Sequence, residues 1–193
     1  MKKILSVALL TVASSFALAE PPAFAFTLEG TGFDDAAELY QLDPVLLYSV
    51  ALAESASGRG DGNVAPWPWT LRTLTKPYYG LTKDDAIKRL DGIIAERGPK
   101  VSVDIGFMQV NWFWHGHRVD KPSDLLDPKI NLATGAQILS ETIKSAPGDL
   151  ELGVGRYHHW VDEEVSRAYG ARVLSIYGQL KSLQGDRYAA LTN

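Results

Sequence analysis

The sequence predicts a mainly α fold, a helical domain with a small irregular or β-containing insertion. Leu47, Val50 and Ala51 recur at the spacing of one helical face. Asp-Pro pairs at 43–44 and 127–128 can each cap and open a helix. The insertion is expected at residues 58–80, which are rich in Gly, Pro and aromatic residues.

The helices are placed by their start and stop signals. Asp43 can cap a helix that has Pro44 at its first position, and we expect this helix to run to about Ser57, with Gly58 as its stop. A later helix starts at Thr82 and closes near an Arg-Gly-Pro sequence. The expected helices are 34–42, 44–57, 82–97, 128–144, about 149–159 and 161–183.

The other segments are predicted to be non-helical. Within the insertion, TLRTL at 70–74 could supply a short strand pair. Residues 101–117 form a mostly non-helical aromatic stretch, and residues 184–193 are expected to be a frayed tail. With no internal repeat or low-complexity linker, residues 26–193 are predicted to form one domain.

Composition excludes some classes of protein. In a chain of 193 residues, 46 % are hydrophobic and 22 % charged, which is typical of a globular domain and not of a disordered one. The net charge is −4 and no basic run occurs, so a nucleic-acid partner is not indicated. The absence of cysteine excludes disulfides and a lipidated N-terminal cysteine.

Residues 1–25 resemble a secretory signal peptide. Two lysines precede a short apolar run, and two A-x-A sites allow cleavage after Ala19 or after Ala25. A transmembrane anchor is the alternative, but the uncharged run is short for a span and ends in small residues. The sequence therefore predicts an exported, periplasmic protein without a stable membrane anchor.

Glu54 is the candidate catalytic group. It lies on the same helical face as Leu47, Val50 and Ala51, so its carboxyl group should point to the core or into a cleft. Loss of solvation there raises a carboxyl pKa, and a protonated acid can donate to a glycosidic oxygen. A surface glutamate on the last helical turn is the alternative.

Four short motifs occur in order: ES at 54–55, GFMQVN at 106–111, NLATGA at 131–136 and GRYHH at 155–159. Together they resemble the lytic transglycosylases of the soluble-transglycosylase (SLT) type, which share the goose-lysozyme-like fold. The resemblance covers about residues 34–183. PWPWTLR and YYG also resemble the subgroup linked to conjugative elements and specialised secretion.

The resemblance implies roles for particular residues. Glu54 falls on the catalytic acid/base, and Ser55 on a serine expected near the sugar's N-acetyl group or in a helix-terminal hydrogen bond. Gln109 and Asn111 fall on polar positions that line the floor of the glycan groove, with Met108 packed beneath it.

Three further positions are compared with the family pattern. Tyr157 falls on the tyrosine that faces the catalytic glutamate, whereas Asn131 is expected to be structural. His158 departs from the family, which most often has asparagine at that position, and a histidine titrates.

The implied reaction uses one carboxyl group. Glu54 protonates the β-1,4 bond between N-acetylmuramic acid and N-acetylglucosamine, then takes the proton of the C6 hydroxyl, which leaves a 1,6-anhydro end without cofactor or metal. One alternative is a hydrolytic muramidase, in which Asp61 or Asp104 positions water. A second is an inactive glycan-binding scaffold of an envelope machine.

Aromatic and histidine residues gather near these motifs. Two or three of the seven rings are expected to touch glycan, with Tyr79 the strongest candidate and Trp112 expected to be packed. The seven are Trp67, Trp69, Tyr78, Tyr79, Trp112, Phe113 and Trp114. His115, His117, His158 and His159 lack the spacing of a zinc motif, so no metal is predicted.

Overall fold

The computed structural model describes residues 26–58, 60, 62–74 and 76–191. The predicted signal peptide, with its cleavage sites after Ala19 or Ala25, lies outside this range, as does Asp61. The fold is mainly helical with small antiparallel sheets, which confirms the predicted fold class. In the described part of the chain, no helix has the length and apolarity needed to cross a membrane.

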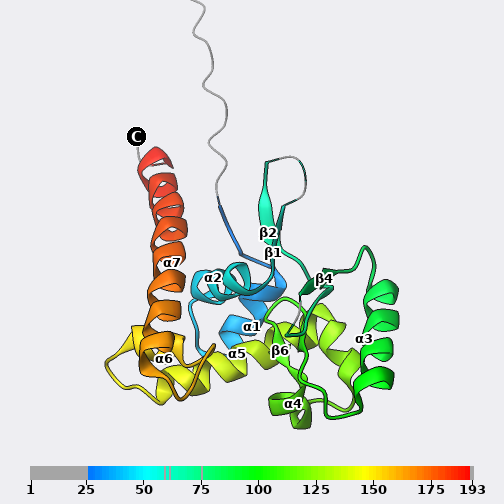
Figure 1. Cartoon of the computed structure of the whole chain (residues 1–193). Coiled ribbons are helices and arrows are strands. Elements are labelled where there is room, and N and C mark those ends of the chain that lie inside the picture. Colours follow the sequence, from blue (N-terminus) through cyan, green and yellow to red (C-terminus); the bar gives the residue numbers. More distant parts are fainter. Residues whose placement is uncertain (1–25, 59, 61, 75, 192–193) are drawn as a thin grey trace, which may run out of the picture.

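In the described residues, seven α-helices form the frame: α1 (Gly32–Tyr40), α2 (Pro44–Ser55), α3 (Lys83–Arg97), α4 (Trp112–His115), α5 (Pro128–Lys144), α6 (Leu150–Gly155) and α7 (Glu163–Leu191). Two 3-10 helices, Gly116–Arg118 and Pro122–Leu126, connect α4 to α5. Figure 1 shows α7 and α3 at opposite sides of the molecule, with α1, α2 and α5 between them.

The helix starts follow the predicted caps. The Asp43 carboxylate accepts from Val45 N at 2.8 Å, and Pro44 opens α2. Thr82 and Asp85 form a reciprocal capping box at the start of α3, and Asp127 caps α5. These side chains accept hydrogen bonds from backbone groups that have no partner within the helix.

The strands lie in two antiparallel sheets. β1 (Ala56–Gly58) pairs with β2 (Val64–Pro66). The second sheet has the order β4-β3-β5-β6 and is built from β3 (Thr70–Arg72), β4 (Pro77–Tyr79), β5 (Asp104–Ile105) and β6 (Val110–Asn111). The segment 70–74, expected to supply a strand pair, contains one strand, and the partner of this strand lies outside it at 77–79.

Several sequence predictions differ from the structure. The first helix spans 32–40 instead of 34–42, and the helix expected at about 149–159 ends at Gly155. α2 ends at Ser55, not Ser57, because residues 56–58 pair with β2, so Gly58 is not a helix stop. A short helix, α4, interrupts the stretch expected to be non-helical. The C-terminal residues 184–191 are not a frayed tail, because α7 continues to Leu191.

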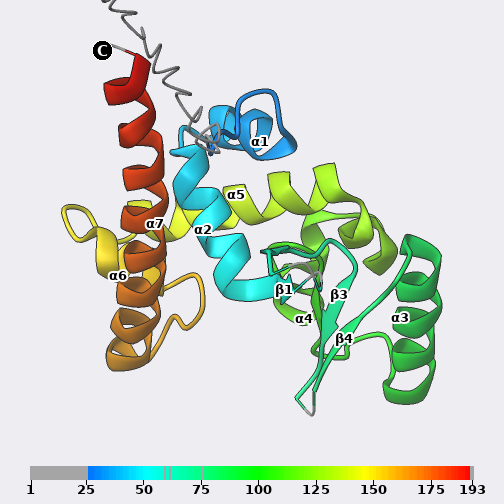
Figure 2. The ribbon, with the colours of Figure 1, turned by 90° about the horizontal axis from the view of Figure 1, so that it is seen from above.

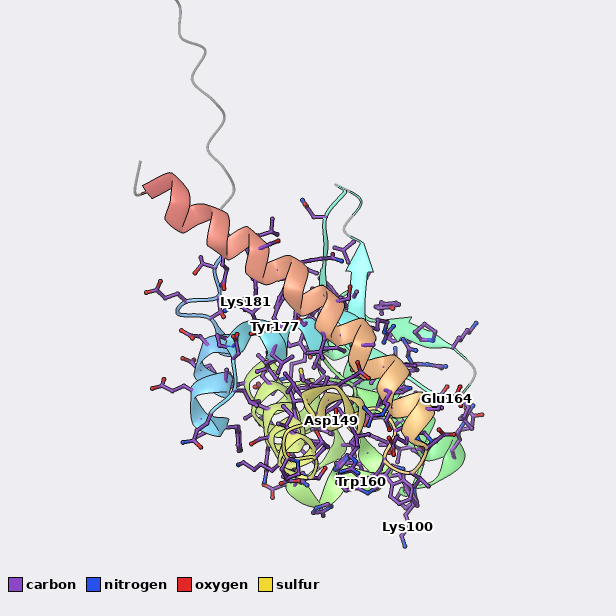
Figure 3. All side chains as sticks on the ribbon, turned by 90° about the vertical axis from the view of Figure 1, so that its left-hand side faces the viewer. Lys100, Asp149, Trp160, Glu164, Tyr177 and Lys181 are labelled. Atoms are coloured by element: carbon purple, nitrogen blue, oxygen red, sulfur yellow. The ribbon has the colours of Figure 1, made fainter. Side chains whose placement is uncertain are left out.

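α7 runs antiparallel to α2 and holds it at both ends. At the start of α2, Tyr177 Oη and Lys181 Nζ contact Asp43 Oδ2 at 2.8 and 3.2 Å. Figure 3 shows Tyr177 and Lys181 close together along α7. At the end of α2, the Arg172 guanidinium donates to Ala53 O at 3.3 Å. This clamp fixes the helix that carries Glu54.

Candidate active site

Glu54 is the penultimate residue of α2, and the helix around it is packed into the core. Leu47, Val50 and Ala51 are fully buried, whereas Glu54 keeps part of its surface accessible. The neighbouring side chains are small, with Ala53 before it and Ala56 after Ser55. The predicted helical face thus presents the carboxyl group at the boundary between the core and solvent.

Tyr169 on α7 is the direct partner of this carboxyl group. Its hydroxyl donates to Glu54 Oε1 at 2.6 Å. Burial raises the pKa of Glu54 to about 7, and the negative charge of Asp104 acts in the same direction. The Tyr169 hydrogen bond and the nearby Arg172 and Arg72 partly oppose this shift. Near neutral pH, Glu54 is therefore divided between its acid and its carboxylate forms.

Ser55 connects α2 to the GFMQVN segment. It is fully buried, and its hydroxyl donates to Phe107 O at 2.7 Å and to Ala51 O at 3.1 Å. Of the two roles expected for Ser55, these contacts support the helix-terminal hydrogen bond. This bond sets the position of the 106–109 turn relative to Glu54.

The 106–109 turn has a constrained backbone. Gly106 has φ of 81° and Gln109 has φ of 45°, so two of its four residues are left-handed. Asn131 fixes the turn from α5: its Oδ1 accepts from Met108 N at 2.8 Å and its Nδ2 donates to Ile105 O at 2.8 Å. A Cβ at Gly106 would overlap the Asn131 amide. These contacts give Asn131 a structural position.

Gln109 is buried, and its side-chain amide nitrogen makes hydrogen bonds whereas its amide oxygen does not. Its Nε2 donates to Gly106 O at 2.8 Å and to Thr70 O at 3.2 Å. Its Oε1 is buried and has no hydrogen-bond partner among the described residues. A buried acceptor without a donor costs free energy.

Tyr157 holds the same turn from the α6–α7 connection. Its hydroxyl donates to Met108 O at 2.6 Å. Burial, followed by the negative charges of Glu54 and Asp104, raises its pKa well above the usual value, so the phenol stays neutral. Met108 itself is fully buried and packs against Gly135. Tyr157 thus lies close enough to Glu54 for the charge of the carboxylate to affect the pKa of the phenol.

Asp104 and Asn111 lie opposite each other on β5 and β6. Asn111 Nδ2 donates to Asp104 Oδ1 at 2.7 Å, and its Oδ1 caps α4 through Trp114 N at 3.2 Å. Burial raises the pKa of Asp104, although the Asn111 hydrogen bond and Arg72 oppose the shift. Asp104 is thus anchored in the sheet and interacts electrostatically with Glu54.

A stack of side chains supports Tyr169, and sequence reasoning missed it. The His158 ring lies parallel to the Tyr169 ring, with centroids 4.7 Å apart and 5° between planes. The Arg172 guanidinium carbon lies 5.2 Å from the centre of the same ring. Burial lowers the pKa of His158, and the positive charge of Arg172 adds to this effect. The neutral imidazole therefore packs on the residue that holds Glu54.

The predicted aromatic residues separate into two groups. Trp67 and Trp112 are partly buried and donate from their indole nitrogens to Gly80 O at 2.7 Å and Pro99 O at 2.8 Å. Tyr79, Phe113 and Trp114 are exposed at 39 %, 48 % and 68 %. Exposed rings remain available to a sugar face, which packed rings are not.

Tyr79 lies on the same face of the sheet as Asp104. Side chains alternate along a strand, and the register pairs Thr70 with Tyr79 and Arg72 with Asp104. Thr70 and Arg72 are two residues apart on β3, so their partners share their face.

Within the described part of the chain, no cluster of three or more His, Cys, Asp or Glu residues could hold a metal ion.

Fold and site together define a class of protein: a mainly helical domain built around one buried carboxyl group with a pKa near neutral. Residues 82–169 match the family model of the transglycosylase SLT domain. This segment is therefore similar to the SLT domain of lytic transglycosylases, which act on peptidoglycan, and the mainly helical structure agrees with the lysozyme-like fold of that domain. Comparisons with curated proteins and with solved structures found no match.

The matched segment covers only part of the site. It includes Met108, Gln109, Asn111 and Tyr157, and it ends at Tyr169. Glu54, Ser55 and Tyr79 precede it. Glu54 is connected to the matched segment by the hydrogen bond that it accepts from Tyr169.

Proposed function

We propose that this protein is an exported peptidoglycan lytic transglycosylase in which Glu54 is the sole catalytic acid and base. One observation supports the proposal: the Glu54 carboxyl group is buried, accepts a hydrogen bond from Tyr169 and has a pKa of about 7. A general acid and base is most effective when its pKa lies near the working pH.

The reaction begins with proton transfer from Glu54 to the glycosidic oxygen between N-acetylmuramic acid and N-acetylglucosamine. The C1–O bond breaks, and the 2-acetamido group of the muramic acid stabilises the cationic carbon. Ionised Glu54 then accepts the proton of the C6 hydroxyl as this oxygen bonds to C1. The products are a free N-acetylglucosamine 4-hydroxyl and a 1,6-anhydro end, and no water is consumed.

Other residues serve binding in this proposal. The unpartnered Gln109 Oε1 accepts a donor from the glycan, and Tyr79 packs on a sugar ring along the edge of the sheet. Asn111 shapes the groove floor while it holds Asp104. Met108, Ser55 and Tyr157 act from beneath the groove by fixing the 106–109 turn.

A hydrolytic muramidase is the second candidate, because the Asp104 carboxylate is close enough to Glu54 to influence its pKa. In that reaction Asp104 would position water. Mass spectrometry of murein digested by the protein separates the two, since the lyase leaves anhydro ends and the hydrolase leaves reducing ends. Asp104→Asn should keep anhydro products, whereas reducing ends in the wild type would refute the lyase.

The proposal includes export and local wall opening. The signal-peptide pattern at 1–25 supports delivery to the envelope, and the PWPWTLR and YYG stretches support a link with a conjugation or secretion apparatus. Fractionation of cells that express the full chain, with N-terminal sequencing of the mature protein, tests export. A mature N-terminus at residue 20 or 26 is expected.

A further inference from the structure

The four-stranded sheet separates two environments. Arg72 and Asp104 are paired in register and lie on one face of the sheet. The charges of both residues affect the pKa of Glu54. Leu71 pairs with Tyr78, and because side chains alternate, both lie on the opposite face. α3 covers that opposite face, as Figure 2 shows with α2 and α3 on different sides of β3 and β4.

A hollow of about 330 Å³ lies between the β3–β4 hairpin and α3. The buried side chains of Leu71 and Ile93 lie at its base. Arg89, Ile93 and Arg97 recur every four residues on α3, so they share the helical face that lines the hollow. The hollow is outside the catalytic site, and no step of the proposed reaction uses it.

The rim of the hollow is cationic although the chain is acidic overall. Lys76, Arg89 and Arg97 line it together with one acid, Glu96, in a chain of net charge −4. Glu96 pairs only loosely with Arg97, at 4.0 Å. Among the described residues, neither Lys76 nor Arg89 has an ion-pair partner. Arg89 is thus available to an anionic ligand, and so is Arg97, whose contact with Glu96 is at the limit of an ion pair.

We propose that this hollow binds the stem peptide that branches from the glycan strand. The inference rests on the proposed function, because it takes the peptidoglycan substrate as given. Stem peptides are short, carry small apolar side chains and free carboxylates, and contain a diamino acid. Arg89 and Arg97 pair with the carboxylates, Leu71 and Ile93 contact the methyl groups, and Glu96 is placed to meet the ammonium group of the diamino acid.

The sheet geometry allows one strand of substrate to reach both faces. β4 is an outer strand of the sheet, and Tyr79 on it lies on the Glu54 face while Tyr78 lies on the hollow's face. Layers that pack on a sheet lie about 10 Å away. An extended peptide of four residues spans about 13 Å, so a stem can pass around the edge of β4.

Two forms of substrate test the proposal. The Arg89→Ala/Arg97→Ala variant should raise KM for intact murein by roughly three- to tenfold, as expected for two partly exposed charge pairs. On murein stripped of stem peptides by an amidase, its KM should equal that of the wild type, and kcat should be unchanged on both. Thermal melting checks that the variant is folded.

The matched control removes two exposed cations that do not line the hollow, Lys88→Ala/Lys100→Ala. It should leave both KM values unchanged. An equal change on intact and stripped murein, or no change on either, would overturn the stem-peptide site. Failure of the proposed function looks different, since the wild type would then release no anhydro product from either substrate.

A binding measurement separates the site from catalysis. Catalytically inactive Glu54→Gln protein, titrated with a free stem tripeptide, should bind it with an affinity that falls with added salt. Adding Arg89→Ala and Arg97→Ala to this protein should abolish the binding. Unaltered peptide affinity in that triple variant would refute the proposal.

Discussion

The Tyr169 hydroxyl donates a 2.6 Å hydrogen bond to Glu54 Oε1, and the two residues are 115 positions apart in the chain. α7 brings them together because the same helix also holds the start of α2 through Tyr177 and Asp43. Burial raises the pKa of this carboxyl group, whereas the Tyr169 hydrogen bond lowers it and holds the carboxyl group in one orientation. α2 provides the burial and α7 provides the donor.

Glu54→Gln should abolish release of anhydro-muropeptides, because an amide cannot donate the required proton. It should also stabilise the fold at pH 8 but not at pH 5. The folded-state pKa of Glu54, about 7, lies above the ordinary value of 4.5, so the favourable contribution of this group is present below pH 4.5 and is lost as the pH rises through 7. The gain at pH 8 is roughly 3 kcal/mol at most, measured by urea unfolding.

An exposed glutamate on α7 provides the control. Glu164→Gln should change neither activity nor the pH dependence of unfolding, and Figure 3 shows Glu164 on α7. Full activity in Glu54→Gln would refute the catalytic role. Equal stability changes at the two pH values would instead refute the raised pKa.

Tyr169→Phe should shift the alkaline limb of activity to higher pH. The hydrogen bond from Tyr169 favours the ionised carboxylate, so its removal raises the pKa of Glu54 further. The maximal rate should fall about tenfold, since the carboxyl group also loses its orienting partner. A pH profile of kcat/KM on murein measures both effects.

Tyr177→Phe is the matched control for this variant. It removes a hydroxyl from the same helix, but that hydroxyl contacts Asp43 at the far end of α2. It should lower stability without moving the pH profile. If Tyr177→Phe and Tyr169→Phe shifted the alkaline limb equally, the local role of Tyr169 would be wrong.

His158→Asn should remove the acid limb of the pH profile. His158 is neutral at pH 7, because burial and then Arg172, His159 and Arg72 lower its pKa. Below that pKa the ring becomes a cation stacked on Tyr169, beside the guanidinium of Arg172. Repulsion between the two cations should displace the His158 ring from Tyr169, the residue that orients the Glu54 carboxyl group.

Rates measured from pH 4.5 to 7 test this expectation. The wild type should lose activity on the acid side, and His158→Asn should not. His117→Asn, an exposed histidine of the 3-10 helix after α4, should behave as the wild type does. An unchanged acid limb in His158→Asn would assign that limb to another group.

Glu54 is predicted from sequence as the catalytic candidate because helical spacing and a short motif both mark it. Tyr169 is missed because no short motif contains it, although Tyr169, Val173 and Tyr177 recur every four residues and so share one face of α7. Asp43 and Pro44 are placed correctly, since a cap is a local feature.

Other elements depend on interactions that the local sequence does not encode. β5 and β6 have two residues each, too few for a strand propensity to be recognised, and they exist through pairing with their neighbours. The last helix, expected to end at 183, continues through Gly185 to Leu191. The good helix formers at 187 and 189–191 offset the cost of one glycine.

Gly135→Ala should destabilise the protein and disturb the site together. In most helices this exchange stabilises by about 1 kcal/mol. At Gly135, however, a Cβ would overlap the side chain of Met108, whose backbone carbonyl accepts from Tyr157. Overpacking of this kind costs about 1–3 kcal/mol and should displace the turn that carries Gln109.

Gly92→Ala in α3 is the matched exchange, because no atom lies within 4 Å of its added Cβ. Thermal melting should show a higher Tm for Gly92→Ala and a lower Tm for Gly135→Ala. Murein clearing should be unchanged in the first variant and strongly reduced in the second. A stabilised, fully active Gly135→Ala would mean that Met108 can move without affecting the 106–109 turn, and that this turn does not control the position of Gln109.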